Sequence, residues 1–419
     1  MNYQEMLAWI HDQKKFGIKP GLKRMLWVLS QLGNPQNQIK GIHVVGTNGK
    51  GSTVNNLQKI FTLAGYEVGT FTSPYIMDFR ERIGLDGHMI SKEDLVATAN
   101  RVRPIADRLP QETDLGPATE FELITLIMFL YFGEVHPVDI AIIEAGLGGL
   151  YDSTNVFQAM AVVCPSIGLD HQQILGDTYQ DISRQKSGVL KGGEHVIMAI
   201  EQDEARQCFI DKAEQVGANI WEYKKQFGMT ETGKIYEFTS SEGTISDLAI
   251  AMPGQHQVAN AALAIMTSLL LKDTYPKVSQ TAIKTALAKN HWLGRTELLA
   301  PNFMIDGAHN HESVAVLVDL LQTTYPTKKI HILFAAIDTK PISDMLAQLG
   351  TLGTVEVTTF DFPNAYPIDK YPKELPRVSH FSSFLERLEQ ASEDEFFLIT
   401  GSLYFISEVR QYWKHQHTD

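Results

Sequence analysis

Short runs of β-branched and other apolar residues alternate along the chain with amphipathic helical stretches, and this alternation restricts the fold more than any other feature. Such a pattern is typical of a parallel sheet with helices on both faces. One large α/β unit therefore extends to about Pro253. Its predicted strands are residues 42–45, 68–71, 138–143, 161–163 and 196–199.

The pattern changes after the last of these strands. From about residue 220 the apolar residues alternate in short segments, which predicts a small sheet annex over about residues 220–253. Two helices are predicted next, over residues 258–271 and 279–289. A second strand–helix alternation follows Arg295, with strands predicted at residues 303–305, 330–334, 355–359 and 396–400, and helices that begin near His311, Ile342 and Ser382.

The two alternations predict an α/β protein of two domains. We expect a large parallel-sheet domain with a phosphate-binding loop and the annex over residues 1–296. A smaller Rossmann-like α/β domain should follow over residues 297–419. A length of 419 residues fits two domains better than one small module.

Composition excludes several classes of function. The chain has 36 Lys and Arg against 49 Asp and Glu, and the net charge of −13 argues against nucleic-acid binding as its main role. Two cysteines are too few for a disulfide framework or a cysteine-rich zinc site. The longest apolar run, residues 123–132, is too short to span a bilayer, and no signal peptide is recognisable. We therefore expect a cytoplasmic protein that does not bind membranes.

The sharpest local signal is the segment Val-Val-Gly-Thr-Asn-Gly-Lys-Gly-Ser at residues 44–52, between an apolar strand and an amphipathic helix. Glycines let consecutive N–H groups turn toward a phosphate, Lys50 neutralises its charge, and a hydroxyl can bind Mg²⁺. The strict nucleotide-binding pattern is not met, because Val44 replaces the first glycine and Gly51 separates Lys50 from Ser52. The order strand, loop, helix nevertheless favours phosphate binding over a turn that binds nothing.

A carboxylate ends a second strongly apolar segment. Glu144 follows the run of residues 138–143 and precedes a glycine-rich turn. In an open parallel sheet the carboxyl ends of the strands form the ligand-binding edge, so Glu144 should face the same crevice as the glycine-rich loop. We favour a role in holding Mg²⁺ beside ATP phosphates over a role as a cap of the turn.

Other polar residues give weaker signals on their own. A histidine after a strand, such as His171, is more often a hydrogen-bonded loop residue than a ligand, and a helical lysine such as Lys186 is usually solvated. Arg295 lies at the expected domain boundary and could reach a transferring phosphate, while Asp306 ends a strand and could hold a ribose. An ion pair between Arg295 and Asp306 is the alternative.

Taken together, these residues resemble the folylpolyglutamate synthases, a family of the Mur ligase superfamily of ATP-dependent acid–amino-acid ligases. The resemblance covers nearly the whole chain, and its motifs occur in the order of the family. They are residues 46–52, 72–75, 81–83, 144–149, 152–155, 169–171 and 186–188, then His256-Gln257 with Asn260, and residues 306–310 and 401–404.

The resemblance implies a set of nucleotide and metal contacts. Lys186 matches a lysine that the family carbamylates, which turns a cation into a carboxylate-like group near the second of two Mg²⁺ ions. The implied metal residues are Ser52, Ser73, Glu144, His171 and Lys186. The implied ATP contacts are Asn48, Gly49, Lys50, Gly51, Ser52, Asn260, Arg295 and Asp306.

The resemblance also implies the substrate side of the site. Ser73, Tyr75 and Ser402 are implied substrate contacts, with residues 72–83 as a mobile loop over the folate pocket. His309 matches a position near the incoming glutamate. The residues implied in catalysis are Lys50, Glu144, Lys186, Arg295 and His309.

The implied reaction adds L-glutamate to the terminal glutamate carboxylate of a reduced folate, through an acyl phosphate made from ATP, and releases ADP and phosphate. We expect a monomer that binds these small molecules and neither nucleic acid nor membrane. One alternative is a related ligase, such as a bifunctional dihydrofolate synthase/folylpolyglutamate synthase or a peptidoglycan-precursor ligase. Another is a P-loop regulatory ATPase. Leu150 and Tyr151 stand where bifunctional relatives often carry Arg-Leu, which disfavours dihydropteroate as a second substrate.

Overall fold

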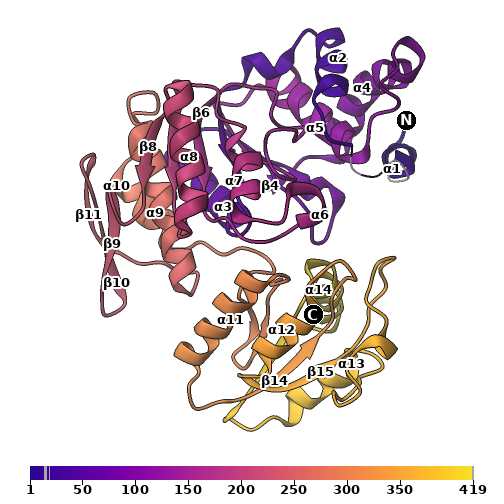
Figure 1. Ribbon diagram of the computed structural model, residues 1–419, viewed down its shortest axis with the longest axis vertical. Coiled ribbons are helices and arrows are strands. Elements are labelled where there is room, and N and C mark those ends of the chain that lie inside the picture. Colours follow the sequence, from indigo (N-terminus) through magenta and orange to yellow (C-terminus); the bar gives the residue numbers. More distant parts are fainter. Residues whose placement is uncertain (14–16, 18, 418–419) are drawn as a thin grey trace. The chain divides into compact units, whose positions relative to one another are not determined.

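Figure 1 shows the computed structural model of the protein, which describes residues 1–13, 17 and 19–417. The chain forms two compact units, the first from residues 1–251 and 257–290 and the second from residues 252–256 and 291–419. The second unit thus begins before the predicted boundary at residue 296. Residues 252–256 also belong to the second unit. The sequence did not predict this, because contacts between segments far apart in the chain cannot be read from the order of residues.

The first unit is built on an eight-stranded sheet with the order β4-β3-β2-β5-β1-β6-β7-β8. Strands β2, β5, β1, β6, β7 and β8 run parallel, whereas β3 and β4 are antiparallel additions at one edge. The strands are β1 (Gly41–Val44), β2 (Val68–Phe71), β3 (Ile83–Leu85), β4 (His88–Met89), β5 (Ile140–Glu144), β6 (Ala159–Cys164), β7 (His195–Met198) and β8 (Asn219–Glu222).

Helices cover both faces of this sheet, as the continuous apolar runs of its strands require. In β5, Ile140 and Ile142 pack into the core on one face, and Ala141 and Ile143 into the core on the other. The first core is covered by α3 (Lys50–Leu63), α9 (Gln255–Leu270) and α10 (Gln280–Ala288). The second is covered by α1 (Tyr3–Asp12), α2 (Lys23–Gln31), α4 (Lys92–Glu112), α5 (Glu120–Leu130), α7 (Tyr179–Ser187) and α8 (Asp203–Val216), and the short α6 (Gln172–Leu175) precedes α7.

The annex is a three-stranded antiparallel sheet of β9 (Phe227–Thr232), β10 (Ile235–Ser240) and β11 (Gly243–Leu248). Its predicted start near residue 220 is wrong, because residues 219–222 form β8 and pair in parallel with β7 of the large sheet. Alternation of apolar residues predicts an extended strand but does not say which sheet the strand joins. The fold class itself is confirmed.

The second unit contains a five-stranded mixed sheet with the order β12-β13-β16-β14-β15. The sequence patterns missed β12, which pairs antiparallel with β13 directly after the chain enters this unit. The strands are β12 (Glu297–Ala300), β13 (Phe303–Ile305), β14 (Lys329–Phe334), β15 (Gly353–Val357) and β16 (Glu395–Thr400). Its helices are α11 (His311–Thr324) and α12 (Ile342–Leu349) on one face, and α13 (Ser382–Leu385) and α14 (Leu403–His417) on the other.

No helix in the described part of the chain is both long enough and apolar enough to cross a membrane.

A buried amide network ties α3 to the end of the first unit. Asn55 donates from Nδ2 to Oδ1 of Asn290 at 2.7 Å, and Asn290 donates to Oδ1 of Asn56 at 2.6 Å. All three side chains are at most 5% exposed. Because buried amides without partners are costly, this network fixes the last residue of the unit, Asn290, against the helix that follows the glycine-rich loop.

We expect Asn290→Ala to lower the free energy of unfolding by about 2–3 kcal/mol, because it removes the acceptor of Asn55 and the donor to Asn56 in a buried environment. Urea unfolding followed by tryptophan fluorescence would measure the change. The control is Asn100→Ala on the exposed side of α4, for which we expect less than about 0.5 kcal/mol. Equal effects of the two substitutions would contradict a special role for the network.

Candidate active site

The loop of residues 45–49, here called the glycine loop, connects β1 to α3 and is held by the segment that follows β6. The N–H of Thr47 donates to the carbonyl of Ser166 at 2.9 Å, and the N–H of Asn48 donates to the Ser166 hydroxyl at 3.0 Å. The Thr47 hydroxyl in turn donates to the carbonyl of Gly168 at 3.1 Å. The loop is therefore shaped before any ligand binds.

Gly49, directly before α3, has a conformation that favours glycine. Its φ is +85°, and a Cβ there would lie 2.7 Å from Oδ1 of Asn260 and 2.9 Å from Cβ of Pro165. Among the residues that the structure describes, no side chain caps this end of α3. Since the N–H groups of a first helical turn have no partner within the helix, they can bind an anion at the loop.

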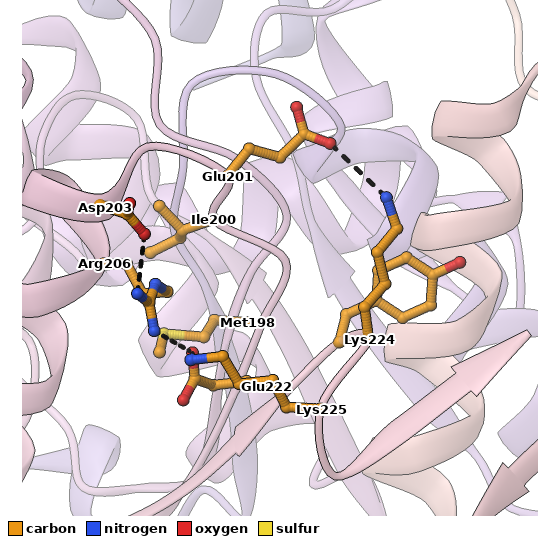
Figure 2. Close-up of a pocket in the computed structure, with 9 residues that line it drawn as sticks. Met198, Ile200, Glu201, Asp203, Arg206, Glu222, Lys224 and Lys225 are labelled. Atoms are coloured by element: carbon orange, nitrogen blue, oxygen red, sulfur yellow. Dashed lines mark hydrogen bonds and ion pairs between the residues drawn. The ribbon is translucent and has the colours of Figure 1, made fainter.

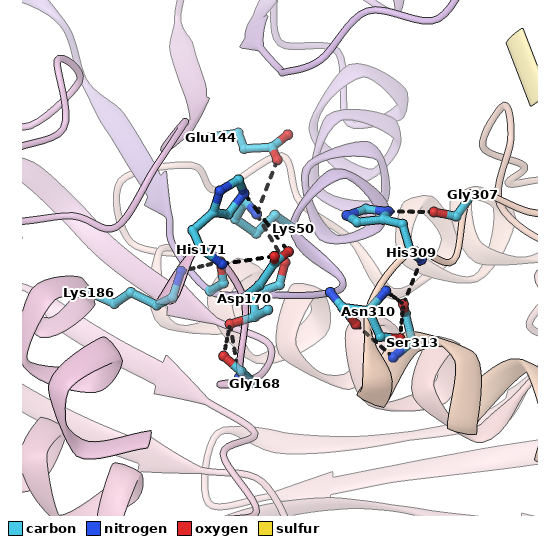
Figure 3. Close-up of polar contacts among 12 residues, drawn as sticks. Lys50, Glu144, Gly168, Asp170, His171, Lys186, Gly307, His309, Asn310 and Ser313 are labelled. Atoms are coloured by element: carbon cyan, nitrogen blue, oxygen red, sulfur yellow. Dashed lines mark hydrogen bonds and ion pairs between the residues drawn. The ribbon is translucent and has the colours of Figure 1, made fainter. Parts of the chain in front are cut away.

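Lys50 and Glu144 form a charge pair behind the loop (Figure 3). The Lys50 Nζ lies 3.7 Å from Oε1 of Glu144 and donates to the carbonyl of Thr47 at 3.2 Å. Glu144 ends β5 and is 4% exposed. A buried carboxylate beside a lysine can hold that lysine in place or, with a hydroxyl such as Ser52, supply oxygen ligands to a hard cation.

Lys186 reaches the glycine loop from α7. Its Nζ donates to the carbonyl of Gly46 at 2.8 Å, and the residue is 5% exposed. Burial, reinforced by the charge of Lys50, lowers the pKa of Lys186 to about 7. A substantial neutral fraction at neutral pH is unusual for lysine and distinguishes this amine from a solvated one.

Sheet order brings the other metal candidates to the same edge. Because β2, β5, β1 and β6 are adjacent and parallel, Ser73 after β2, Glu144 at the end of β5 and the residues after β6 all emerge together. His171 has a φ of +52°, a half-exposed side chain, and an Nε2 that lies 3.9 Å from Oδ2 of Asp170. Ser52 is buried and accepts a hydrogen bond from Gln257 at 3.3 Å.

The side-chain oxygens near the glycine loop are of the kind that bind Mg²⁺ together with substrate phosphates. In the described ranges no three His, Cys, Asp or Glu side chains gather as a metal cage. Mg²⁺ is usually held by one or two carboxylates together with waters and substrate phosphates, and the Glu144 carboxylate and the Ser52 hydroxyl are oxygen donors of the kind that such a site uses. A zinc-type site would need more nitrogen or sulfur donors.

The second unit gathers its own candidate residues at the carboxyl end of β13. Asp306 is buried and accepts the N–H groups of Thr296 at 2.7 Å and Ala308 at 2.8 Å. Burial raises the pKa of this carboxyl, and the charge of Arg295 opposes that shift. Asp306 thus fixes the backbone directly after Arg295, which is a structural function that the sequence did not reveal.

His309 and Ser402 lie on neighbouring strand ends of the same unit. The Nδ1 of His309 is 2.6 Å from the carbonyl of Gly307, and its N–H donates to the Ser313 hydroxyl at 3.0 Å. Ser402 is buried after β16, and Gly401 beside it donates its N–H to the carbonyl of Ala308 at 3.1 Å. Figure 3 shows His309 with Asn310 and Ser313 at the start of α11.

Comparison with known proteins decides the family. The Mur ligase middle domain matches residues 44–268. A dihydrofolate synthase/folylpolyglutamate synthase of Bacillus subtilis is 39% identical, and a folylpolyglutamate synthase of Lacticaseibacillus casei is 33% identical; each match covers 98% of both chains. A solved FPGS–AMPPCP–folate complex has a TM-score of 0.85 at 32% identity and covers 98% of this chain and 99% of that chain. The chain belongs to the folylpolyglutamate synthase family of Mur ligases.

Several residues of this family member escaped the sequence interpretation. Ser166 and Pro165 shape the glycine loop. Gln257, which the sequence indicated only as part of a motif, hydrogen-bonds both Ser52 and Asn260, the latter at 3.1 Å. The sequence indicated His256 only as part of a motif. Burial and the charge of Arg295 lower its pKa to about 4, so the ring is neutral beside that arginine.

One family motif is largely structural. Asp152 is buried and accepts the N–H groups of Leu147 at 2.7 Å and Thr154 at 3.0 Å. The Thr154 hydroxyl donates to the same carboxylate and lies 2.8 Å from Nε2 of His43. Since burial lowers the pKa of His43 to about 3, this ring stays neutral, and the network holds the turn that follows Glu144.

A cavity of about 260 Å³ lies at the carboxyl ends of β7 and β8 and the start of α8. Figure 2 shows that its acidic and basic side chains pair with one another: Arg206 contacts Asp203 and Glu222, and Lys224 lies near Glu201. The candidate site residues do not line this cavity. The charged side chains of this cavity pair with one another, so the glycine loop remains the candidate site.

We expect Lys50→Ala to weaken ATP binding at least tenfold, about 1.4 kcal/mol, because the variant loses the charge that faces the phosphates. Isothermal titration calorimetry would measure the dissociation constant, and circular dichroism would check the fold. Lys59→Ala, farther along α3, is the matched control and should bind like the wild type. An unchanged dissociation constant for Lys50→Ala would refute the assignment of the loop.

Proposed function

We propose that this chain attaches L-glutamate to the terminal glutamate carboxylate of a reduced folate, through an acyl phosphate formed with ATP. As a member of the folylpolyglutamate synthase family, the chain is an ATP-dependent ligase that adds glutamate to folates. Our proposal adds three things to this activity: the acyl phosphate intermediate, the identity of the carboxylate that is activated, and the roles of single residues. The observation that carries them is the preshaped start of α3, which no side chain in the described part of the chain caps, beside the pair of Lys50 and the buried Glu144.

The family assignment removes two of the alternatives. A P-loop regulatory ATPase and a peptidoglycan-precursor ligase both fit the glycine loop alone. They do not fit full-length similarity to folylpolyglutamate synthases. The FPGS–AMPPCP–folate complex supports ATP and a folate as ligands of this chain as well.

The first step needs negative charge to be neutralised around the transferring phosphate. The N–H groups of Gly49, Lys50, Gly51 and Ser52, the Asn48 amide and the Lys50 ammonium would bind the phosphate oxygens. Asn260, next to Gly49, and Arg295 and Asp306 of the second unit are the further proposed nucleotide contacts. The folate carboxylate attacks the γ-phosphorus, the bond from that phosphorus to the bridging oxygen breaks, and ADP leaves with the electron pair.

The second step forms the amide. The amino group of glutamate attacks the acyl carbon, phosphate leaves, and the nitrogen loses a proton. We propose that His309 and Ser402 orient the incoming glutamate, and that Ser73 and Tyr75 contact the folate. An acyl phosphate hydrolyses readily, so excluding water is part of the task of the site.

We propose that side-chain donors around the glycine loop hold two Mg²⁺ ions. Ser52, Ser73, Glu144 and His171 would hold the ions, which when bound would screen the phosphate charges. Lys186 would contribute as a carbamate. Carbon dioxide adds to the neutral amine, the new N–C bond forms and a proton is released, which leaves an anion next to the glycine loop.

We expect Lys186→Ala and Lys186→Arg each to lower ligase kcat about 10- to 100-fold, since neither side chain can carry a carbamate that positions a metal ligand. A small carboxylic acid such as acetate should partly restore Lys186→Ala and leave Lys186→Arg unchanged. Phosphate release would be measured with ATP, tetrahydrofolate and glutamate. Wild-type activity of Lys186→Arg would rule out the carbamate.

A bifunctional enzyme that also accepts dihydropteroate is the remaining alternative, favoured by the name of the Bacillus subtilis relative. The turn after Gly149 bears on this choice. The N–H of Leu150 donates to the carbonyl of Gln185 at 2.6 Å, and the Tyr151 side chain is half exposed. Neither residue supplies a guanidinium to pair with a pterin acid.

We expect kcat/KM for tetrahydrofolate to exceed that for dihydropteroate at least tenfold, about 1.4 kcal/mol of transition-state binding. Phosphate release would be measured with each acid, with and without glutamate. Release only when a reduced folate, glutamate and ATP are all present supports the proposed function. Comparable values for the two acids would show that the enzyme is bifunctional, and release independent of any acid would refute the proposal.

A further inference from the structure

The segment between β2 and β3 is organised around one carboxylate. Glu81 accepts three successive backbone N–H groups, those of Ile76 at 2.7 Å, Met77 at 3.0 Å and Asp78 at 3.1 Å. The oxygen that accepts from Ile76, Oε2, also lies 3.2 Å from the backbone nitrogen of Met77. Both oxygens of a charged acceptor are thus used on backbone donors, which are stronger hydrogen bonds than those between neutral groups.

The same segment is closed at its base. The N–H of Thr72 donates to the carbonyl of Arg82 at 3.0 Å, and the Thr72 hydroxyl donates to the carbonyl of Glu81 at 3.3 Å. Residues 73–75 therefore lie between the closed base and the three N–H groups that Glu81 binds. Ser73 and Tyr75, the proposed folate contacts, belong to this short stretch.

Aromatic packing fixes the Tyr75 side chain. Its ring meets that of Phe79 edge to face with centroids 5.7 Å apart, and the Arg82 guanidinium lies 5.3 Å from the Tyr75 ring and 5.4 Å from the Phe79 ring. Arg82 also pairs with Glu120 at 3.5 Å. The ring is held by its neighbours, and Glu81 binds the backbone directly after Tyr75.

Asp78 acts on the outer side of the segment. Its carboxylate pairs with Arg80 at 2.8 Å and lies 3.3 Å from the Tyr3 hydroxyl, and its side chain is 30% exposed. It contributes a backbone N–H to Glu81, and that N–H survives any change of its side chain. The Glu81 carboxylate therefore binds the backbone of the segment, whereas the Asp78 carboxylate contacts the side chains of Arg80 and Tyr3.

We propose that Glu81 is a positioning residue for folate, which holds residues 73–78 in the conformation that presents Ser73 and Tyr75 to the substrate. This inference rests on the proposed function. In place of the carboxylate an amide would turn an NH₂ group toward backbone donors, and donors do not bind donors. The segment would then have to rearrange, although no substrate contact had been removed.

The test compares Glu81→Gln with Asp78→Asn and the wild type. For Glu81→Gln we expect KM for tetrahydrofolate to rise at least tenfold, about 1.4 kcal/mol, and KM for ATP to rise less, because Ser73 is also a proposed Mg²⁺ contact whereas Tyr75 is proposed to contact only the folate. Amide hydrogen exchange of residues 76–78 should accelerate in the same variant. Asp78→Asn should keep both KM values and the exchange rates near those of the wild type.

The outcomes separate this inference from the function it rests on. If the wild type does not consume ATP in the presence of tetrahydrofolate and glutamate, the proposed function fails. If the wild type is active and Glu81→Gln keeps its KM for tetrahydrofolate, the positioning role is overturned. Should Glu81→Gln not fold, Glu81→Asp, which keeps the charge on a shorter side chain, is measured in its place with the same expected split between folate and ATP.

Discussion

Three adjacent parallel strands end at the same edge of the large sheet, and the site depends on this constraint. The glycine loop follows β1, Glu144 ends β5, and Ser166 and Gly168 follow β6. Hydrogen bonds from the loop to the β6 side fix its backbone, while the Lys50–Glu144 contact links it to the β5 side. The loop is therefore preorganised by its two neighbours, and binding an anion there requires little ordering of the protein.

Burial then sets the charges at this edge. Lys50, Glu144 and Lys186 come from three separate elements, and the low exposure of Glu144 and Lys186 strengthens every interaction between them. Burial disfavours the charged form of Lys186, and Lys50 adds to this effect. The Lys186 amine therefore loses its proton at a lower pH than a solvated lysine does.

Three carboxylates among the motif residues shape the backbone. Asp152, Asp306 and Glu81 use their oxygens to accept backbone N–H groups and hold the turns that carry other functional residues. Glu144 instead ends β5 and pairs with Lys50. The motifs of this family therefore include residues that hold the backbone in place.

The sequence by itself determined the strand–helix alternation, the order of the motifs and the position of the glycine-rich segment 44–52 between a strand and a helix, because these depend on neighbours along the chain. Tertiary structure decided that residues 219–222 join the large sheet and that Asn260 packs against Gly49. It also decided that Asp306 serves the backbone beside Arg295. These features rest on contacts between segments far apart in the chain, and local patterns carry no information about which segments meet.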